Sequence, residues 1–217
     1  AICTFVYTVK TTGEKDGFAA GSGVEGDPYI IETTEQFLKL DAETNADFFG
    51  PTVKYFKLNA DIDLTGKKVD GEAAWVDGTV NAVLKSVKNI SLDGDGHKLY
   101  NFDSGLESVI AAIHNGTANF SKLSFYLDGQ NMTFLYSSAS GTSATFNKVN
   151  AYGNKQNASQ NSGVYTTYTL GTLTFENCKN YCAIDSTDRY VSAFAGYPWS
   201  DVVFSNCVNY GDIAATS

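Results

Sequence analysis

Four tyrosines occupy one position of a near-repeat in the second half of the chain. Each copy runs from a phenylalanine to a tyrosine six residues later: Phe120 to Tyr126, Phe146 to Tyr152, Phe175 to Tyr181 and Phe204 to Tyr210. Tyrosine combines a large apolar ring with a polar tip, so an outward column of tyrosines could bind sugar rings or a protein. Alternatively, the rings stack only to stabilise the fold, or contact a neighbouring loop. These four tyrosines are the candidate ligand-binding residues.

A cluster of acidic residues surrounds one of the two histidines and could in principle bind calcium. The segment DGDGH ends at His97, and Asp61 and Asp63 precede it in a neighbouring segment. Carboxylate oxygens are calcium ligands, but an EF-hand loop requires a glutamate at its twelfth position, which this segment lacks. Asp-Gly pairs are also ordinary turn formers. We therefore expect no metal site.

The residues needed for catalysis do not form a recognisable set. A hydrolase of polysaccharides needs carboxylates that converge from adjacent strands. The four late aspartates occupy different offsets in the repeat: Asp185, Asp188, Asp201 and Asp212. A lyase would need a basic residue beside a calcium cluster, and the chain has a single arginine, Arg189. His97 and His114 have no cysteine or serine partner nearby in the sequence. We expect no catalytic residues and no cofactor.

Charge and composition restrict the classes of partner. The net charge of -9, from 15 basic and 24 acidic residues, opposes binding to nucleic acid or anionic lipid, which are held mainly by Lys and Arg. No run of about 18 apolar residues is present, so we expect no membrane insertion within this segment. The single methionine, the many Ser, Thr and Asn residues, and a start without Met or basic residues suggest a processed or excised extracellular or cell-surface protein.

The repeat must place these residues on stacked strands. Its phenylalanines lie 26, 29 and 29 residues apart, which is the length of one unit of a solenoid. A glycine precedes each phenylalanine strand (Gly116, Gly141, Gly171 and Gly196), and a second apolar stretch follows each tyrosine. We predict an all-β fold, a right-handed parallel β-helix of about five to six rungs, in which the phenylalanine and the residue three positions later point inward.

The whole chain, residues 1–217, is expected to form one domain. Residues 1–54 would supply a strand at 4–9, a connector, a short strand at 27–32 and a helix at 33–44. A threonine cap and Gln36 predict a capping box for that helix, which would cover the first rung. Residues 55–217 would form the stacked rungs, beginning with one alternating strand at 55–64 and a polar insertion at 65–78 that carries Trp75.

The four cysteines do not form a disulfide framework. Cys178 and Cys207 hold the same repeat position, and side chains that point in parallel from adjacent rungs rarely reach disulfide geometry, so we expect buried thiols. Cys3 and Cys182 lie off that column and cannot be paired from the sequence. Four asparagines also repeat (Asn177, Asn180, Asn206 and Asn209), and we interpret them as turn residues that hydrogen-bond along the stack.

Several segments of the sequence resemble a known class of modules. They are GSGVEGDPYII at 21–31, YFKLNADIDL at 55–64, LDGDGHKL at 92–99 and the repeated NCxNY. They are similar to the β-helix modules of large bacterial cell-surface proteins related to the GLUG-motif family. The resemblance covers most of the chain from Gly21 onward and implies export, usually within an anchored multidomain parent.

Modules of this class more often act in adhesion, as spacers or in surface display than in catalysis. The leading hypothesis is a non-catalytic adhesion module that binds a host or environmental glycan, glycoprotein or secreted protein such as an immunoglobulin. The alternatives are a structural spacer and a polysaccharide-active enzyme. An exposed last rung at 203–213 would leave backbone hydrogen-bonding groups unpaired. We therefore expect either further chain beyond this rung or association of the protein through that end.

Overall fold

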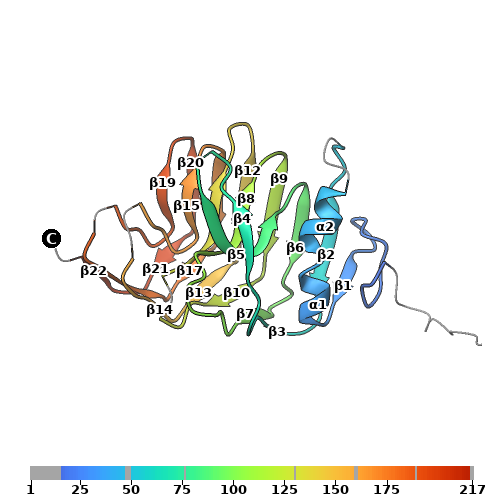
Figure 1. Cartoon of the computed structure of the whole chain (residues 1–217), viewed down its shortest axis with the longest axis horizontal. Helices are drawn as coiled ribbons and strands as arrows, with labels where there is room; N and C mark the ends of the chain where they lie inside the picture. The colour runs from blue at the N-terminus through green and yellow to red at the C-terminus, as the bar shows by residue number, and fades with distance from the viewer. Residues whose placement is uncertain are drawn as a thin grey trace, which may run out of the picture.

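A computed structural model describes residues 16–46, 50–75, 77–129, 131–158, 161–188 and 190–215, which form a parallel β-solenoid of about six turns (Figure 1). Sheet 1 contains β1 (Tyr29–Ile31), β2 (Lys54–Leu58), β6 (Ile90–Asp93), β9 (Thr117–Ser121), β12 (Ser143–Asn147), β16 (Thr172–Glu176) and β20 (Val202–Ser205). Sheet 2 contains β3 (Ile62–Asp63), β7 (Lys98–Tyr100), β10 (Ser124–Tyr126), β13 (Asn150–Tyr152), β17 (Lys179–Asn180) and β21 (Val208–Asn209).

The remaining strands complete each turn of the solenoid. Sheet 3 contains β4 (Val69–Glu72), β5 (Thr79–Ser86), β8 (Ser108–Ile113), β11 (Thr133–Ser138), β15 (Thr166–Thr169) and β19 (Ala195–Pro198). A small sheet 4 contains β14 (Asn154–Lys155), β18 (Ala183–Ser186) and β22 (Ile213–Ala215). The named strands pair in parallel except β4 and β5, which pair antiparallel. The predicted parallel β-helix is confirmed.

The phenylalanine column forms the core of sheet 1. Phe120, Phe146, Phe175 and Phe204 are direct partners on adjacent strands. The first three are fully buried, as are the residues three positions later: Leu123, Val149 and Cys178. A strand places alternate side chains on opposite faces, so one apolar residue per rung at a constant offset produces a continuous apolar column. The inward direction predicted for these positions is confirmed.

The corner between sheets 1 and 2 contains a residue with positive φ in each later rung. These residues are Lys122, Lys148, Asn177 and Asn206, with φ between 48° and 56°. Asparagine tolerates this left-handed backbone better than most residues, and Asn206 Nδ2 donates to Asn177 Oδ1 at 3.4 Å. The turn role of these two asparagines is confirmed.

The turn role predicted for Asn180 and Asn209 is wrong, whereas the hydrogen bond predicted along the stack is present between them. Both residues lie in strands, β17 and β21, and Asn180 is fully buried. Its side-chain amide donates to Cys182 O at 2.9 Å and to Asn209 Oδ1 at 2.7 Å. These bonds satisfy a polar side chain that the strand direction places inside the solenoid.

The N-terminal helix is present as two short segments, α1 (Thr34–Phe37) and α2 (Leu40–Asn45). Thr33 and Gln36 form the predicted capping box. Phe37 and Leu40 are buried, and α2 reaches sheet 3 through a 3.2 Å hydrogen bond from Asn45 Nδ2 to Ser86 O. The helix thus covers the first turn, as expected, at the end of the solenoid where the blue segments lie in Figure 1.

Three predictions about local structure need correction. The strand expected at 55–64 is split into β2 and β3, because the chain turns a corner of the solenoid between them. The insertion at 65–78 is not only a polar loop, since it contains β4. Gly196 does not form a turn before the last phenylalanine strand but lies within β19. The strand predicted at 4–9 lies outside the described residues, as do Cys3 and Arg189.

The prediction of buried, unpaired thiols at Cys178 and Cys207 is confirmed for Cys178, whereas Cys207, on the open last turn, is unpaired but only partly buried. Cys178, Cys182 and Cys207 are unpaired, and the first two are fully buried. Burial raises the pKa of the Cys178 and Cys182 thiols to about 12, so both are neutral thiols at physiological pH. They act as small apolar core residues.

The last turn exposes residues whose equivalents in earlier turns are buried. Phe204 is 53% exposed, whereas its partner Phe175 is fully buried. Ile213 is also exposed, whereas its partner Ile184 is buried. Val203 and Tyr210 add further exposed side chains to this turn. The expected open rung is therefore present, and association through this end stays a prediction.

Candidate functional site

The tyrosine column forms a regular ladder on sheet 2. Adjacent rings are 4.9 to 5.0 Å apart between centroids, and their planes differ by 8° to 15°. This spacing follows the distance between paired strands, on which each ring stands. The rings point away from the core: Tyr126 and Tyr152 are half-buried, while Tyr181 is 39% and Tyr210 is 59% exposed. All four predicted residues are therefore brought together on one outer surface.

The parallel stacking determines which parts of the rings are free. Each inner ring has its two faces covered by neighbouring tyrosines, so its edge and hydroxyl remain for a partner. Burial by this packing raises the pKa of Tyr152. The open face of Tyr210 is the exception, because it lies on the last turn. The ladder is thus suited to edge and hydroxyl contacts rather than to stacking of sugars on ring faces.

The ladder is longer than the repeat indicates. Tyr100 lies at the end of β7, where Leu99 pairs with Phe125 of β10. Lys98 Nζ lies 4.9 Å from the Tyr100 ring centroid and 5.5 Å from that of Tyr126, so a cation–π contact links the two rings. The repeat does not reveal Tyr100. Leu92 takes the place of the phenylalanine in this rung, and Tyr100 follows it by eight residues rather than six, because the turn after Leu92 is two residues longer than in later rungs.

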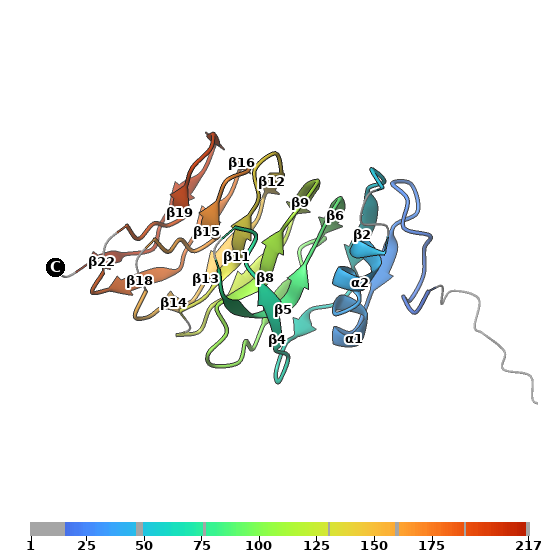
Figure 2. The same ribbon diagram turned by 45° about the horizontal axis from the view of Figure 1, so that its top comes forward.

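A second aromatic surface lies on the outer face of sheet 3 and depends on the β4–β5 hairpin. Figures 1 and 2 show β4 and β5 in front of the other turns of the solenoid. Val80 and Ala82 of the hairpin pack on Ala111 of β8. Ala74 N donates to Ser137 Oγ at 2.8 Å, and that hydroxyl donates to Ala111 O at 2.9 Å. The hairpin is therefore attached to two strands of the sheet.

Five aromatic residues meet where the hairpin tip reaches the later turns. We call this cluster the aromatic platform, and its members are Trp75, Tyr136, Tyr168, Tyr197 and Trp199. Their contacts are edge-to-face, with interplanar angles between 61° and 90° and centroid distances between 5.5 and 6.4 Å. Trp199 is 64% exposed. The sequence reasoning missed this platform.

A signal for part of the platform is present in the sequence. Tyr168 and Tyr197 each precede a core phenylalanine by seven residues, so they recur with the same 29-residue spacing as Phe175 and Phe204. Tyr168 and Tyr197 are direct partners of β15 and β19. Trp75 has no periodic equivalent, since it comes from the insertion.

The acidic cluster near His97 is occupied by contacts within the chain. Asp93 pairs with Lys122 at 2.8 Å and Asp95 with Lys57 at 2.9 Å. Asp61 accepts from the backbone N–H of Lys98 and contacts His97 Nδ1 at 3.1 Å. The hydrogen bond from Lys57 lowers the pKa of Asp95. Among the described residues, no three His, Cys, Asp or Glu side chains form a group that could hold a metal ion.

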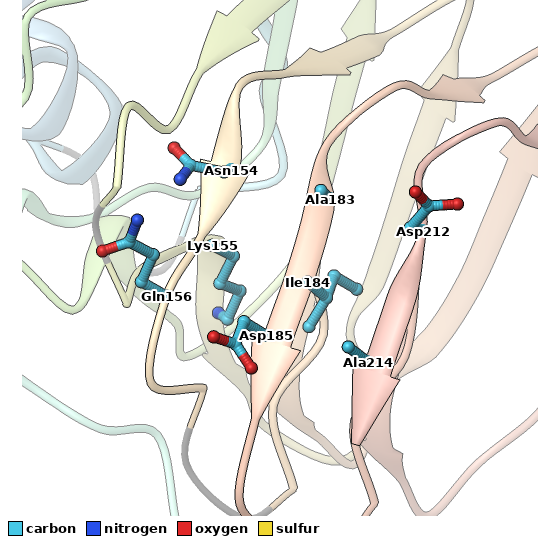
Figure 3. Close-up of a pocket in the computed structure, with 8 residues that line it drawn as sticks. All are labelled: Asn154, Lys155, Gln156, Ala183, Ile184, Asp185, Asp212 and Ala214. Carbon is cyan, nitrogen blue, oxygen red and sulfur yellow. The ribbon is translucent and has the colours of Figure 1, made fainter. Parts of the chain in front are cut away.

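A buried lysine borders a cavity of about 380 Å³ beside sheet 4. Lys155 is 1% exposed, and its Nζ donates to Met132 O at 2.7 Å and to Gly163 O at 3.1 Å. Figure 3 shows it on the strand next to Asp185, with Asp212 on the following rung. Burial lowers the pKa of Lys155 to about 7. Its two acceptors are neutral carbonyls, which do not offset the cost of burying a charge.

Comparison with known proteins assigns no family to this chain. No protein-family model matches this chain, and no curated protein matches it. A similar solved structure is that of a "putative immunoglobulin A1 protease" from Bacteroides ovatus. The two chains are 20% identical with a TM-score of 0.45, over 91% of this chain and 70% of the other. The likeness to GLUG-motif modules stays an interpretation of the sequence, and no residue role is transferred.

Among the described residues, no helix is both long enough and apolar enough to cross a membrane.

Gly71 determines how closely the hairpin approaches the sheet. A Cβ at this position would lie 2.5 Å from the Ala111 side chain, well inside van der Waals contact. We expect Gly71→Ala to push the hairpin away from β8 and lower the free energy of unfolding by about 1 kcal/mol. Tryptophan emission should also shift to the red as Trp75 becomes hydrated.

Gly78 provides the matched control for this substitution. It lies at the same hairpin's exposed tip, and a Cβ there meets no atom within 4 Å, although its φ of 138° adds local strain. Gly78→Ala should leave the emission unchanged. Equal emission from Gly71→Ala and the wild type would contradict close packing of the hairpin.

Proposed function

We propose that the chain is a non-catalytic binding module of an exported bacterial surface protein, and that the tyrosine ladder binds a secreted host protein or glycoprotein, for which an immunoglobulin is the first candidate. The observation that carries the proposal is the outward column of four stacked tyrosines. Stacking holds the rings in one orientation, so little side-chain entropy is lost when a partner binds.

The exposed groups of the ladder favour a polypeptide surface over a free sugar. Ring edges supply apolar contact, and a row of hydroxyls separated by one strand spacing supplies donors and acceptors. Tyrosine is enriched in protein interfaces for this combination. Lys98 at one end and the exposed Lys179 add positive charge to an otherwise acidic chain. A partner with an acidic patch beside an apolar strip would match this surface.

A structural spacer is the second candidate, and one observation favours it. The covered faces of Tyr126, Tyr152 and Tyr181 are what a ladder with a purely stabilising role would show. A spacer would tolerate changes of the exposed ring edges with no loss of any interaction. The two candidates therefore differ in binding rather than in fold.

The test is capture of secreted host proteins, including immunoglobulins A and G, by the immobilised chain. We expect Tyr152→Ala with Tyr181→Ala to reduce capture at least tenfold, measured by surface plasmon resonance well below the melting temperature. The pair Tyr152→Phe with Tyr181→Phe retains the stacked rings and removes only the hydroxyls, so it should lose less affinity. Circular dichroism would confirm that both variants remain folded.

Tyr190→Ala is the matched control, because Tyr190 is 61% exposed and lies outside the ladder. It should capture as the wild type does. Capture that survives the double alanine change would move the site away from the ladder. Absence of capture by the wild type would favour the spacer, and turnover of an acidic polysaccharide would instead indicate an enzyme.

A further inference from the structure

We infer that the aromatic platform is a second binding site, separate from the ladder, and that its ligand is a neutral glycan. The platform comprises Trp75, Tyr136, Tyr168, Tyr197 and Trp199. It lies on sheet 3, whereas the ladder lies on sheet 2. The two surfaces differ in ring geometry and in the charges beside them, and both differences bear on the ligand.

Ring geometry is the first difference. In the ladder, planes differ by at most 15°, so the faces of neighbouring rings cover each other. In the platform, Trp75 and Tyr168 meet at 90°, and Tyr197 and Trp199 meet at 73°. An edge-to-face contact covers a face of only one of its two rings. The negative face of an aromatic ring attracts the weakly positive C–H groups of a pyranose, so free faces suit a sugar.

The platform, like the ladder, is held in a fixed arrangement by contacts within the chain. The hairpin is attached through Ala74 and Ser137, and Gly71 allows its close approach to Ala111. Tyr136 packs against this hairpin cluster, and burial raises the pKa of Tyr136 to about 12. Only Trp199 extends well into solvent, at 64% exposure. A surface that is already ordered binds a ligand with a smaller entropic loss.

The polar groups beside the platform determine the charge of the ligand. A shallow cavity of about 330 Å³ at the hairpin tip is lined by Glu72, Asp77 and Thr79 with Ala73 and Gly78. Glu107 is close enough to Tyr136 to raise the pKa of that phenol further. Carboxylates accept hydrogen bonds from sugar hydroxyls and repel anionic sugars and phosphates. This charge complementarity selects a neutral glycan.

A second copy of the chain is a poorer occupant, because it would bring the same carboxylates against Glu72 and Asp77.

The two tryptophans make the platform directly measurable. The chain contains two tryptophans in all, and both belong to the platform. Intrinsic tryptophan emission should therefore report ligand binding without a label. We expect a saturable emission change when the full chain is titrated with neutral oligosaccharides, using β-1,4-glucan, α-1,4-glucan, β-mannan and β-galactan hexamers. Hexagalacturonate, an acidic counterpart, should bind at least tenfold more weakly than the best neutral hexamer.

Trp199→Ala is the decisive variant. Because Trp199 is largely exposed, its loss should not unfold the chain, and Trp75 remains as the reporter. We expect the dissociation constant for the best hexamer to rise at least tenfold, while Tyr190→Ala leaves it unchanged. No emission change with any neutral hexamer, equal binding of hexagalacturonate, or full affinity in Trp199→Ala would each overturn the assignment.

Two further readouts separate this inference from the ladder proposal. The variant with Tyr152→Ala and Tyr181→Ala should keep the oligosaccharide response, because its substitutions lie on another sheet. Emission that depends on protein concentration without sugar, together with a dimer in analytical ultracentrifugation, would replace the glycan with a second copy. A negative result in the glycan titration therefore does not affect the capture test of the ladder, and a negative capture test does not affect the glycan titration.

Discussion

Phe146→Ala is expected to lower the free energy of unfolding by about 4 kcal/mol, in the range seen when a buried phenylalanine is truncated. Phe146 is fully buried. Its ring stacks on Phe120 at 5.4 Å and on Phe175 at 5.2 Å, and it makes edge contacts with Phe134 and Tyr165. Neighbouring rungs hold the cavity walls, so the space left by the ring cannot collapse. Urea unfolding followed by circular dichroism measures the loss.

The matched control is Phe204→Ala, because Phe204 holds the same repeat position in the last turn. It stacks on Phe175 at 5.2 Å but is 53% exposed. About half of its apolar surface is already in water, so we expect a loss of about 1 kcal/mol. Equal losses for the two variants would show that another layer covers the last turn in solution.

Lys155 should make the stability of the protein rise with pH above neutrality. Its pKa falls from an ordinary 10.5 to about 7 in the folded chain. Between these values the unfolded chain binds more protons than the folded chain, so raising the pH favours folding. From pH 7 to about pH 8.5 we expect a gain of about 1.5 kcal/mol. Urea unfolding at the two pH values measures it.

The cysteine thiols set the upper pH of this experiment, and two lysine variants serve as its controls. The Cys178 and Cys182 thiols have folded pKa values of about 12, raised from 9.0, so they stabilise the fold below pH 9 and lose this contribution as the pH rises further. Measurements should therefore stop near pH 8.5. Lys155→Met should abolish the rise, whereas Lys179→Met, which changes an exposed lysine, should retain it. A rise that persists in Lys155→Met would assign it to another group.

The periodic features of the fold could be predicted from the sequence. A solenoid places residues that share a repeat offset on adjacent strands in direct register, so Phe146 and Phe175 must pair, as must the tyrosines after them. The same rule placed Cys178 and Cys207 in one column without a disulfide. Capping of the helix at Thr33 was also predictable, since a capping box involves residues only three positions apart.

Features that depend on contacts across the chain could not be predicted in the same way. The split of the alternating segment into β2 and β3 has no local signal, because both strands continue the same alternation of apolar residues. Asn180 shares the repeat with Asn177, yet one lies inside the solenoid and the other at its corner. The difference arises because Asn177 lies at the corner, whereas Asn180 lies in β17 on the side that faces the core. Composition does not specify which side of a strand faces the core.

Sequence alone therefore determined the solenoid, its core columns and the outward tyrosine ladder, since each follows from one residue type at a constant offset. Tertiary structure decided which ring faces are free. Parallel stacking covers the ladder faces, whereas the hairpin carries Trp75 across sheet 3 to rings that meet it edge to face. It also decided that Lys155 is buried against backbone carbonyls. These outcomes depend on packing between segments far apart in the chain, where no repeat imposes a register.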